Sequence, residues 1–165
     1  MSSTALGLDR EQRPRAVFFY DGGCGVCKFL VGFVCHRDAT DHFRFSPIQT
    51  KYASAMCERY KMPIDVSTAV LIDEKGGHTH SSSVLLMFGY MGFPYVWLGV
   101  VALLVPAFIR DFAYRTFARN RGAIWKGVKR VTGMGDTRLD DYRDRILGLE
   151  EPTDPSWGFE AKKRQ

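Results

Sequence analysis

The hydrophobic positions in the first part of the chain form one short run and then one longer segment. Residues 16–20 are apolar and end just before Gly22 and Gly23, which predicts a buried strand followed by a turn. Residues 26–37 are apolar around most of a helical circumference and leave only a narrow polar stripe. We therefore expect a helix there that packs against the protein on more than one side.

Shorter segments of alternating character follow. They predict a strand at 43–46, a helix at 52–60, and a hairpin of strands 67–72 and 78–81 around a turn at 73–77. Ser82 or Ser83 is expected to cap a further helix that begins at Val84. The order strand, helix, strand, helix, hairpin, helix predicts an α/β fold in which helices flank a small mixed sheet.

The segment 84–109 is the most apolar part of the chain. No Asp, Glu, Lys or Arg occurs between Lys75 and Arg110. A transmembrane helix needs roughly 20 consecutive apolar residues, but this run is interrupted at Gly89, Gly92, Pro94 and Pro106. We therefore expect a helix that is buried or docked on the protein surface rather than inserted into a membrane.

The next segment is basic and amphipathic. Positions at helical spacing predict one packed face, made of Ile109, Phe112, Ala113, Thr116 and Phe117. Two interpretations of the basic positions between 110 and 130 stay open: a solvated helix face, or contact with anionic lipid or with a membrane protein. Nucleic-acid binding is not expected, because few aromatic residues lie among the basic ones and acidic residues return at 136–144.

The composition fits one globular domain. The chain has 165 residues, of which 45% are hydrophobic and 25% are charged, and its net charge is +5. We expect a flexible segment at 1–15, a domain with a helical extension at 16–130, and a mostly irregular tail at 131–165. Because the first fifteen residues lack the apolar segment of a signal peptide, a cytoplasmic location is expected.

Cys24 and Cys27 are the residues that point most directly to chemistry. They stand three apart at the start of the predicted helix, where free backbone N–H groups and the helix dipole favour a thiolate. A thiolate that faces a second thiol is what thiol–disulfide exchange requires. Because Cys24 comes first and lies nearer to solvent, we assign it as the attacking thiolate and Cys27 as the thiol that resolves the mixed disulfide.

Other uses of the pair have less support. Haem attachment requires a histidine directly after the second cysteine, where this chain has Lys28. Structural zinc usually requires a second cysteine pair, and the remaining candidates here are Cys35, His36, His78 and His80. No metal site is therefore expected. The alternative to an enzyme is a membrane-associated module that binds a metal or senses redox state, and simple burial of the pair is a third interpretation.

The other two cysteines are expected to be small apolar core residues. Cys35 lies eight residues after Cys27 on the same predicted helix, which separates their Cα atoms by about 12 Å. A disulfide needs the two Cα atoms within ~7 Å. Cys35 therefore cannot resolve Cys27, and Cys57 is interpreted in the same way.

Asp21 and Lys28 flank the cysteine pair. The carboxylate of Asp21 either accepts hydrogen bonds from the amides of the turn as a cap, or shuttles a proton to Cys27 as the product leaves. The positive charge of Lys28 is expected to favour the Cys24 thiolate.

The motif Tyr20-Asp21-Gly22-Gly23-Cys24-Gly25-Val26-Cys27 resembles the Asp-x-x-Cys-x-x-Cys signature of the DCC family of thiol-disulfide oxidoreductases. Further similar segments, at 45–49, 81–85, 105–114 and 118–121, extend the resemblance over residues 16–127. It implies a thioredoxin-like fold with additional C-terminal helices. It also implies exchange of electrons between the dithiol and a disulfide-containing protein or a small thiol, without an organic cofactor.

The resemblance also implies supporting residues around the cysteines. Tyr20, Gly22 and Gly23, together with Lys28, are expected to support the site or contact the substrate. Thioredoxins place a cis-proline opposite the Cys-x-x-Cys motif, whereas this chain has Ser67-Thr68 at the matching place. We expect that loop to contact the substrate backbone in a different way.

Overall fold

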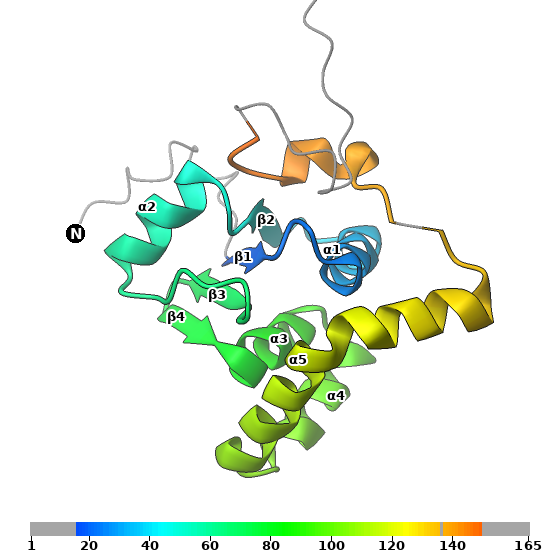
Figure 1. Cartoon of the computed structure of the whole chain (residues 1–165). Helices are drawn as coiled ribbons and strands as arrows, with labels where there is room; N and C mark the ends of the chain where they lie inside the picture. The colour runs from blue at the N-terminus through cyan, green and yellow to red at the C-terminus, as the bar shows by residue number, and fades with distance from the viewer. Residues whose placement is uncertain (1–15, 136, 150–165) are drawn as a thin grey trace, which may run out of the picture.

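The sheet has four strands in the order β2-β1-β3-β4 in the computed structural model, which describes residues 16–135 and 137–149 (Figure 1). The strands are β1 (Ala16–Tyr20), β2 (Phe43–Pro47), β3 (Val70–Asp73) and β4 (Gly76–Thr79). β1 pairs parallel with β2 and antiparallel with β3, and β3 pairs antiparallel with β4. The predicted mixed sheet of a thioredoxin-like α/β fold is confirmed.

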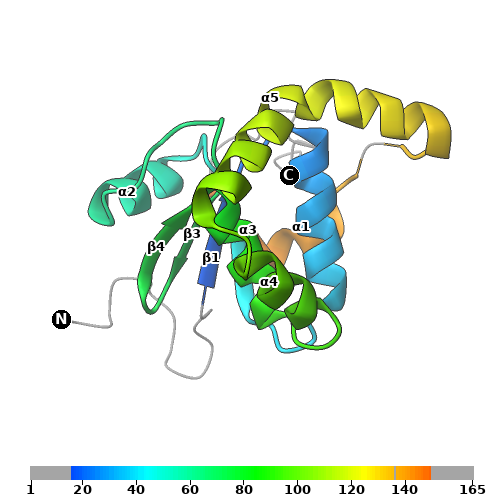
Figure 2. The same cartoon turned by 90° about the horizontal axis from the view of Figure 1, so that it is seen from below.

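Helices cover both faces of this sheet (Figure 2). They are α1 (Gly25–Arg37) and α3 (His80–Tyr90) on one face and α2 (Lys51–Arg59) on the other. β1 is buried on both sides, because Phe18 and Tyr20 pack toward α1 whereas Val17 and Phe19 pack toward α2. Because both faces of β1 are buried, every residue of this strand is apolar or aromatic. The packing also holds Tyr20, the last residue of β1, in place directly before the turn that carries the cysteines.

The hairpin is tighter than predicted. Asp73 accepts hydrogen bonds from the backbone N–H groups of Lys75 and Gly76, so the turn closes early and β4 begins at Gly76 rather than at residue 78. Gly76 has a φ of +134°, a conformation that favours glycine. β4 therefore begins two residues earlier than predicted.

The predicted cap and start of α3 are also wrong. The helix begins at His80, four residues before Val84, and its N-cap residue Thr79 makes no side-chain capping bond. Ser83 instead lies inside the helix, where its hydroxyl donates to the carbonyl oxygens of Ala69 and His80. It ties α3 to the segment that leads into β3.

The apolar segment is divided among several helices, with breaks near Gly92, Pro94 and Pro106. α3 is followed by α4 (Tyr95–Leu103) and α5 (Ala107–Thr132), and α5 ends at Gly133, whose φ is +66°. No single helix among the described residues is long and apolar enough to cross a membrane. α4 and α5 together meet the requirement of length and composition, but they bend by 115° at their junction.

The packed face of α5 also differs from the prediction. All five residues predicted to share a packed face, Ile109, Phe112, Ala113, Thr116 and Phe117, are exposed. The face turned toward the protein carries Tyr114, Ala118, Arg121 and Trp125, at spacings of four, three and four residues. Polar groups on this face bond to the segment before β3, so periodicity of apolar residues alone identified the wrong side.

The described part of the predicted irregular tail is ordered against the domain. Residues 140–145 form a short 3-10 helix (η2, Asp140–Arg145), and Leu139 and Ile146 are buried in the core beside α1 and β2. Arg145 forms an ion pair with Asp38 at 2.8 Å and donates to the carbonyl oxygen of Cys35. The predicted domain boundary at residue 130 stays a prediction, and the predictions for 1–15 and 150–165 lie outside the described residues.

Candidate active site

Cys24 is the N-cap residue of α1, directly after the turn that follows β1. Its backbone N–H donates to the carbonyl oxygen of Asp21 at 3.1 Å, which closes the turn. Its Sγ accepts a hydrogen bond from the backbone N–H of Cys27 at 3.4 Å. Both cysteines are free and half-buried, and both lie at the start of α1.

The two thiols have opposite pKa shifts. The pKa of Cys24 is lowered from 9.0 to about 6, chiefly by a hydrogen bond from the Cys27 thiol, against an opposing effect of burial. The backbone N–H of Cys27 and the charge of Arg121 lower it further. The pKa of Cys27 is raised, because its proton is held by Cys24 and because the group is buried. At neutral pH the pair is therefore a thiolate at Cys24 and a thiol at Cys27.

The carboxylate of Asp21 holds the turn in place. Its Oδ1 accepts from the backbone N–H of Gly23 at 3.0 Å and from the side-chain amide of Gln49 at 2.8 Å. The Gln49 carbonyl in turn accepts from the backbone N–H of Gly22 at 3.1 Å. These are the contacts of a capping residue, and they explain why a carboxylate stands next to a thiolate.

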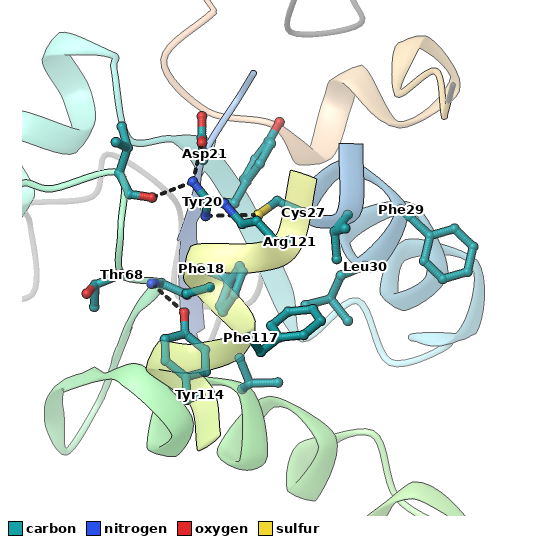
Figure 3. A pocket seen from close by; sticks show the side chains of 15 residues that line it. Phe18, Tyr20, Asp21, Cys27, Phe29, Leu30, Thr68, Tyr114, Phe117 and Arg121 are labelled. Atoms are coloured by element: carbon teal, nitrogen blue, oxygen red, sulfur yellow. Dashed lines mark hydrogen bonds and ion pairs between the residues drawn. The ribbon is translucent and has the colours of Figure 1, made fainter. Parts of the chain in front are cut away.

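Arg121 from α5 joins Asp21 to Cys27 (Figure 3). One guanidinium nitrogen lies 2.6 Å from Asp21 Oδ2, and the other lies 3.8 Å from Cys27 Sγ. Arg121 also donates to the carbonyl oxygen of Val66 at 2.8 Å. No role of Arg121 was predicted from the sequence. The only indication of such a role is that Arg121 lies at helical spacing from Tyr114 and Trp125, and therefore on the same side of the helix.

Residues 66–69, which lie before β3 and opposite the cysteines, are also held by α5. Tyr114 accepts a hydrogen bond from the backbone N–H of Ala69 at 3.0 Å, so two side chains of one helix fix the residues before β3. Thr68 is buried and faces the cavity beside Cys27. Ser67 is exposed and bonds to Asp65 instead, so only Thr68 of the predicted Ser67-Thr68 pair lies at the site.

An apolar cavity of about 290 Å³ lies on the Cys27 side of the pair (Figure 3). Its lining includes Cys27, Phe29, Leu30, Thr68, Tyr114 and Phe117. Arg121 and Asp21 stand at this cavity too. Apolar walls beside a thiol offer a place for an uncharged part of a substrate.

A second cavity, of about 430 Å³, lies on the Cys24 side and is basic. Its lining includes Cys24, Lys28, Arg121, Trp125, Lys126 and Lys129. Lys28 is buried and also lines this cavity. Gly23 also lines this cavity, whereas Gly22 is buried and Tyr20 is buried beneath Cys27 against the apolar cavity.

Gly25 is required because the indole of Trp125 covers the start of α1. A Cβ atom at this position would overlap the indole Nε1, and Trp125 is itself buried against Phe29. We expect Gly25→Ala to lower the free energy of unfolding by about 1–3 kcal/mol through overpacking. Gly127→Ala on α5 is the matched control, since nothing lies within 4 Å of its Cβ. Urea denaturation should show that the control is unchanged or stabilised by up to about 1 kcal/mol, and an equal loss in both variants would contradict the packing argument.

The remaining cysteines and the metal candidates stand apart from this site. Cys35 and Cys57 are buried in the two cores on opposite faces of the sheet, as predicted, and burial raises the pKa of Cys35 to about 12. Among residues 16–135 and 137–149, no group of three or more His, Cys, Asp or Glu side chains is placed to hold a metal ion.

Comparison with known proteins identifies the family. The family model for DCC1-like thiol-disulfide oxidoreductases matches residues 18–127. A chloroplastic DCC family protein of Arabidopsis thaliana is 30% identical over 126 residues, which cover 76% of this chain and 72% of the relative. The uncharacterized protein YuxK of Bacillus subtilis is 29% identical over 123 residues, which cover 74% of this chain and 88% of that protein. No solved structure gives a significant match. The chain, with its Cys24-x-x-Cys27 pair at the start of α1, belongs to the DCC1-like thiol-disulfide oxidoreductase family.

Proposed function

We propose that this protein transfers electrons between the Cys24–Cys27 dithiol and a disulfide substrate. The observation that carries the proposal is the pairing of a thiolate at the N-cap of α1 with a protonated thiol one turn further on. Cavities open on both sides of this pair, so a substrate disulfide can approach the thiolate. Membership of the family supports the same general activity.

The exchange proceeds in two displacements. The Cys24 thiolate attacks one sulfur of the substrate disulfide, so a Cys24–substrate bond forms while the substrate S–S bond breaks and its other sulfur leaves as a thiolate. Cys27 then gives its proton to the substrate thiolate released in the first step and attacks Cys24 Sγ, which forms the Cys24–Cys27 disulfide and releases the second substrate sulfur as a thiolate. The dithiol is oxidised by two electrons and the substrate is reduced by two. The reverse sequence oxidises a substrate dithiol.

Arg121 assists the second displacement in this proposal. Its guanidinium lies 3.8 Å from Cys27 Sγ, where it stabilises the anion that forms when Cys27 loses its proton. Asp21 acts as a positioning residue, because one of its oxygens is held by Gly23 and Gln49 and the other by Arg121. We prefer this role to the proton shuttle.

The substrate in this proposal is a disulfide-containing protein or a small thiol. The apolar cavity beside Cys27 suits the uncharged side chain next to a substrate cysteine, and the basic cavity beside Cys24 suits an anionic group. No organic cofactor is needed, since the two cysteines carry both electrons. A reducing compartment such as the cytoplasm would keep the pair in its dithiol form.

The pH dependence of Cys24 alkylation tests the proposal. We expect the rate of modification by iodoacetamide to rise with pH and to reach half its maximum at about pH 6, because only the thiolate reacts. Since the pKa is lowered, the reactive form is present above pH 6 and is lost below it. Mass spectrometry of the peptide that contains Cys24 gives the alkylation rate for this residue alone. Parallel samples of the same protein without iodoacetamide are tested for reduction of a small aromatic disulfide.

Two outcomes would contradict the proposal. One is a midpoint near the ordinary value of 9.0, which would show that α1 does not stabilise the thiolate. The other is alkylation at pH 6–7 without any reduction of the small disulfide, which would leave a reactive cysteine that performs no exchange. Cys24→Ser serves as the control and should abolish both signals.

A further inference from the structure

One side of α5 carries an exposed row that, apart from Lys126, which also lines the basic cavity, lies outside the two cavities of the candidate active site. The row, called here the α5 stripe, consists of Phe108, Phe112, Arg115, Arg119, Lys126 and Arg130. Successive members are separated by four, three, four, seven and four residues, so they share one side of a helix with 3.6 residues per turn. All six are exposed, and each phenylalanine keeps 74% of its surface accessible.

The stripe has no partner in the described part of its own molecule, because the opposite side of α5 faces the active site. Tyr114 and Arg121 reach the residues before β3, and Trp125 covers the start of α1. The helix therefore has one side committed to the fold and one side directed outward. Two phenylalanines with such large exposed surfaces at the start of a helix need an explanation outside this domain.

The apolar end of the stripe continues onto α4. The exposed apolar residues there are Trp97, Leu98, Val100, Val101 and, at the bend, Leu104 and Val105. Figure 1 shows α4 and the beginning of α5 together at one end of the molecule, away from η2. Isolated apolar residues are normal on a protein surface, but a group of this size marks a site of contact with a partner or a membrane.

The charge along α5 indicates which partner fits. The helix has seven cationic residues and a single acidic one, Asp111, whose carboxylate accepts a hydrogen bond from Ser81. After Asp111 the next acidic residue in the sequence is at position 136. The exposed side thus begins apolar and aromatic and becomes basic. That is the pattern of an interfacial helix, whose apolar part enters a bilayer while its cations meet lipid phosphates.

We propose that the α5 stripe and the exposed residues of α4 dock this protein on the surface of a bilayer that contains anionic phospholipid. The 115° bend between α4 and α5 suits a protein that lies on the membrane, since neither helix alone is long and apolar enough to cross it. A second copy of the chain fits this surface less well than a bilayer does. A two-fold contact through this face would bring the same rows of cations together.

Vesicle co-sedimentation of the full chain tests the proposal. We expect binding to vesicles of phosphatidylcholine mixed with phosphatidylserine, little binding to phosphatidylcholine alone, and release as the salt concentration rises. Phe108→Ser/Phe112→Ser and Arg115→Glu/Arg119→Glu should each weaken binding by about tenfold or more. The matched controls Ile64→Ser and Arg59→Glu change exposed residues of the same kinds outside the stripe, and they should bind like the unmodified chain.

Three results would overturn the proposal: equal sedimentation with both kinds of vesicle, binding that the stripe variants leave unchanged, or self-association in place of vesicle binding. The last is read from light scattering, as a dimer that Phe108→Ser/Phe112→Ser converts to a monomer. The alkylation rate of Cys24 is measured on every variant and should stay the same, because none of the substituted residues touches the cysteines. It also reports whether each variant is folded.

Discussion

A Cys27→Ser variant is expected to accumulate mixed disulfides at Cys24 when it meets its substrate. The first displacement still occurs, because the serine hydroxyl can donate the hydrogen bond that keeps the pKa of Cys24 low. The second displacement fails, since a hydroxyl does not attack a disulfide. Non-reducing electrophoresis followed by mass spectrometry should recover the adducts and identify the trapped thiol or protein.

Three related variants make the result specific. Cys24→Ser should trap nothing and should reduce exchange to the rate of the uncatalysed reaction, whereas Cys57→Ala, a buried cysteine on the other face of the sheet, should behave like the unmodified chain. Cys27→Ala removes the hydrogen-bond donor as well, so it should trap more slowly than Cys27→Ser near pH 6. Adducts found on Cys35 or Cys57, or trapping that persists in Cys24→Ser, would refute the assignment of roles.

Substitution of Arg121 is expected to have the next largest effect. Arg121→Met removes a charge that lowers the pKa of Cys24, so the midpoint of alkylation should move upward from about pH 6. The rate at pH 6 should fall about three- to sixfold, because a rise of about one pKa unit lowers the thiolate fraction at pH 6 from about one half to about one eleventh. Loss of the bonds to Asp21 and Val66 should also lower the free energy of unfolding by about 1–3 kcal/mol. Alkylation profiles and urea denaturation measure the two effects separately.

Substitution of Asp21 should shift the pKa of Cys24 in the direction opposite to substitution of Arg121. The charge of Asp21 raises the pKa of Cys24, so Asp21→Asn should move the midpoint downward, and Asp21→Asn/Arg121→Met should return it toward that of the unmodified chain. Arg119→Met removes an exposed cation two residues away on the same helix and should change neither the midpoint nor the stability. If Arg121→Met destabilises the fold but leaves the midpoint at about pH 6, Arg121 is only a structural residue.

The first half of the fold could be predicted because its signals are local. Residues 16–20 are fully buried, and the helix over 26–37 packs against the sheet, α5 and η2, so the apolar character of both segments does not depend on one neighbour. From residue 80 to residue 109 the sequence has no Asp, Glu, Lys or Arg to mark the solvent side of a helix, so burial there depends on distant contacts. The packed side of α5 is set by Tyr114 and Arg121, whose polar groups reach backbone atoms of the segment before β3.

The candidate site divides in the same way. Cys24, Cys27 and Asp21 lie within one turn and one helix start, so their spacing was enough to predict their proximity. Arg121 lies 100 residues from Asp21 along the chain, and no local pattern links the two. Ser67 was predicted from its place in the sequence alone, and the structure shows that its hydroxyl turns to Asp65.

The contact between β2 and the residues after η2 has a consequence for any shortened form of this protein. Leu147 donates its backbone N–H to the carbonyl oxygen of Phe45, and Ile146 bridges to the same strand, so this stretch covers the outer edge of β2. The family match ends at residue 127, well before this cover begins. A chain cut at the end of the match would leave an open strand edge of the kind that templates aggregation, and it would do so with both cysteines intact.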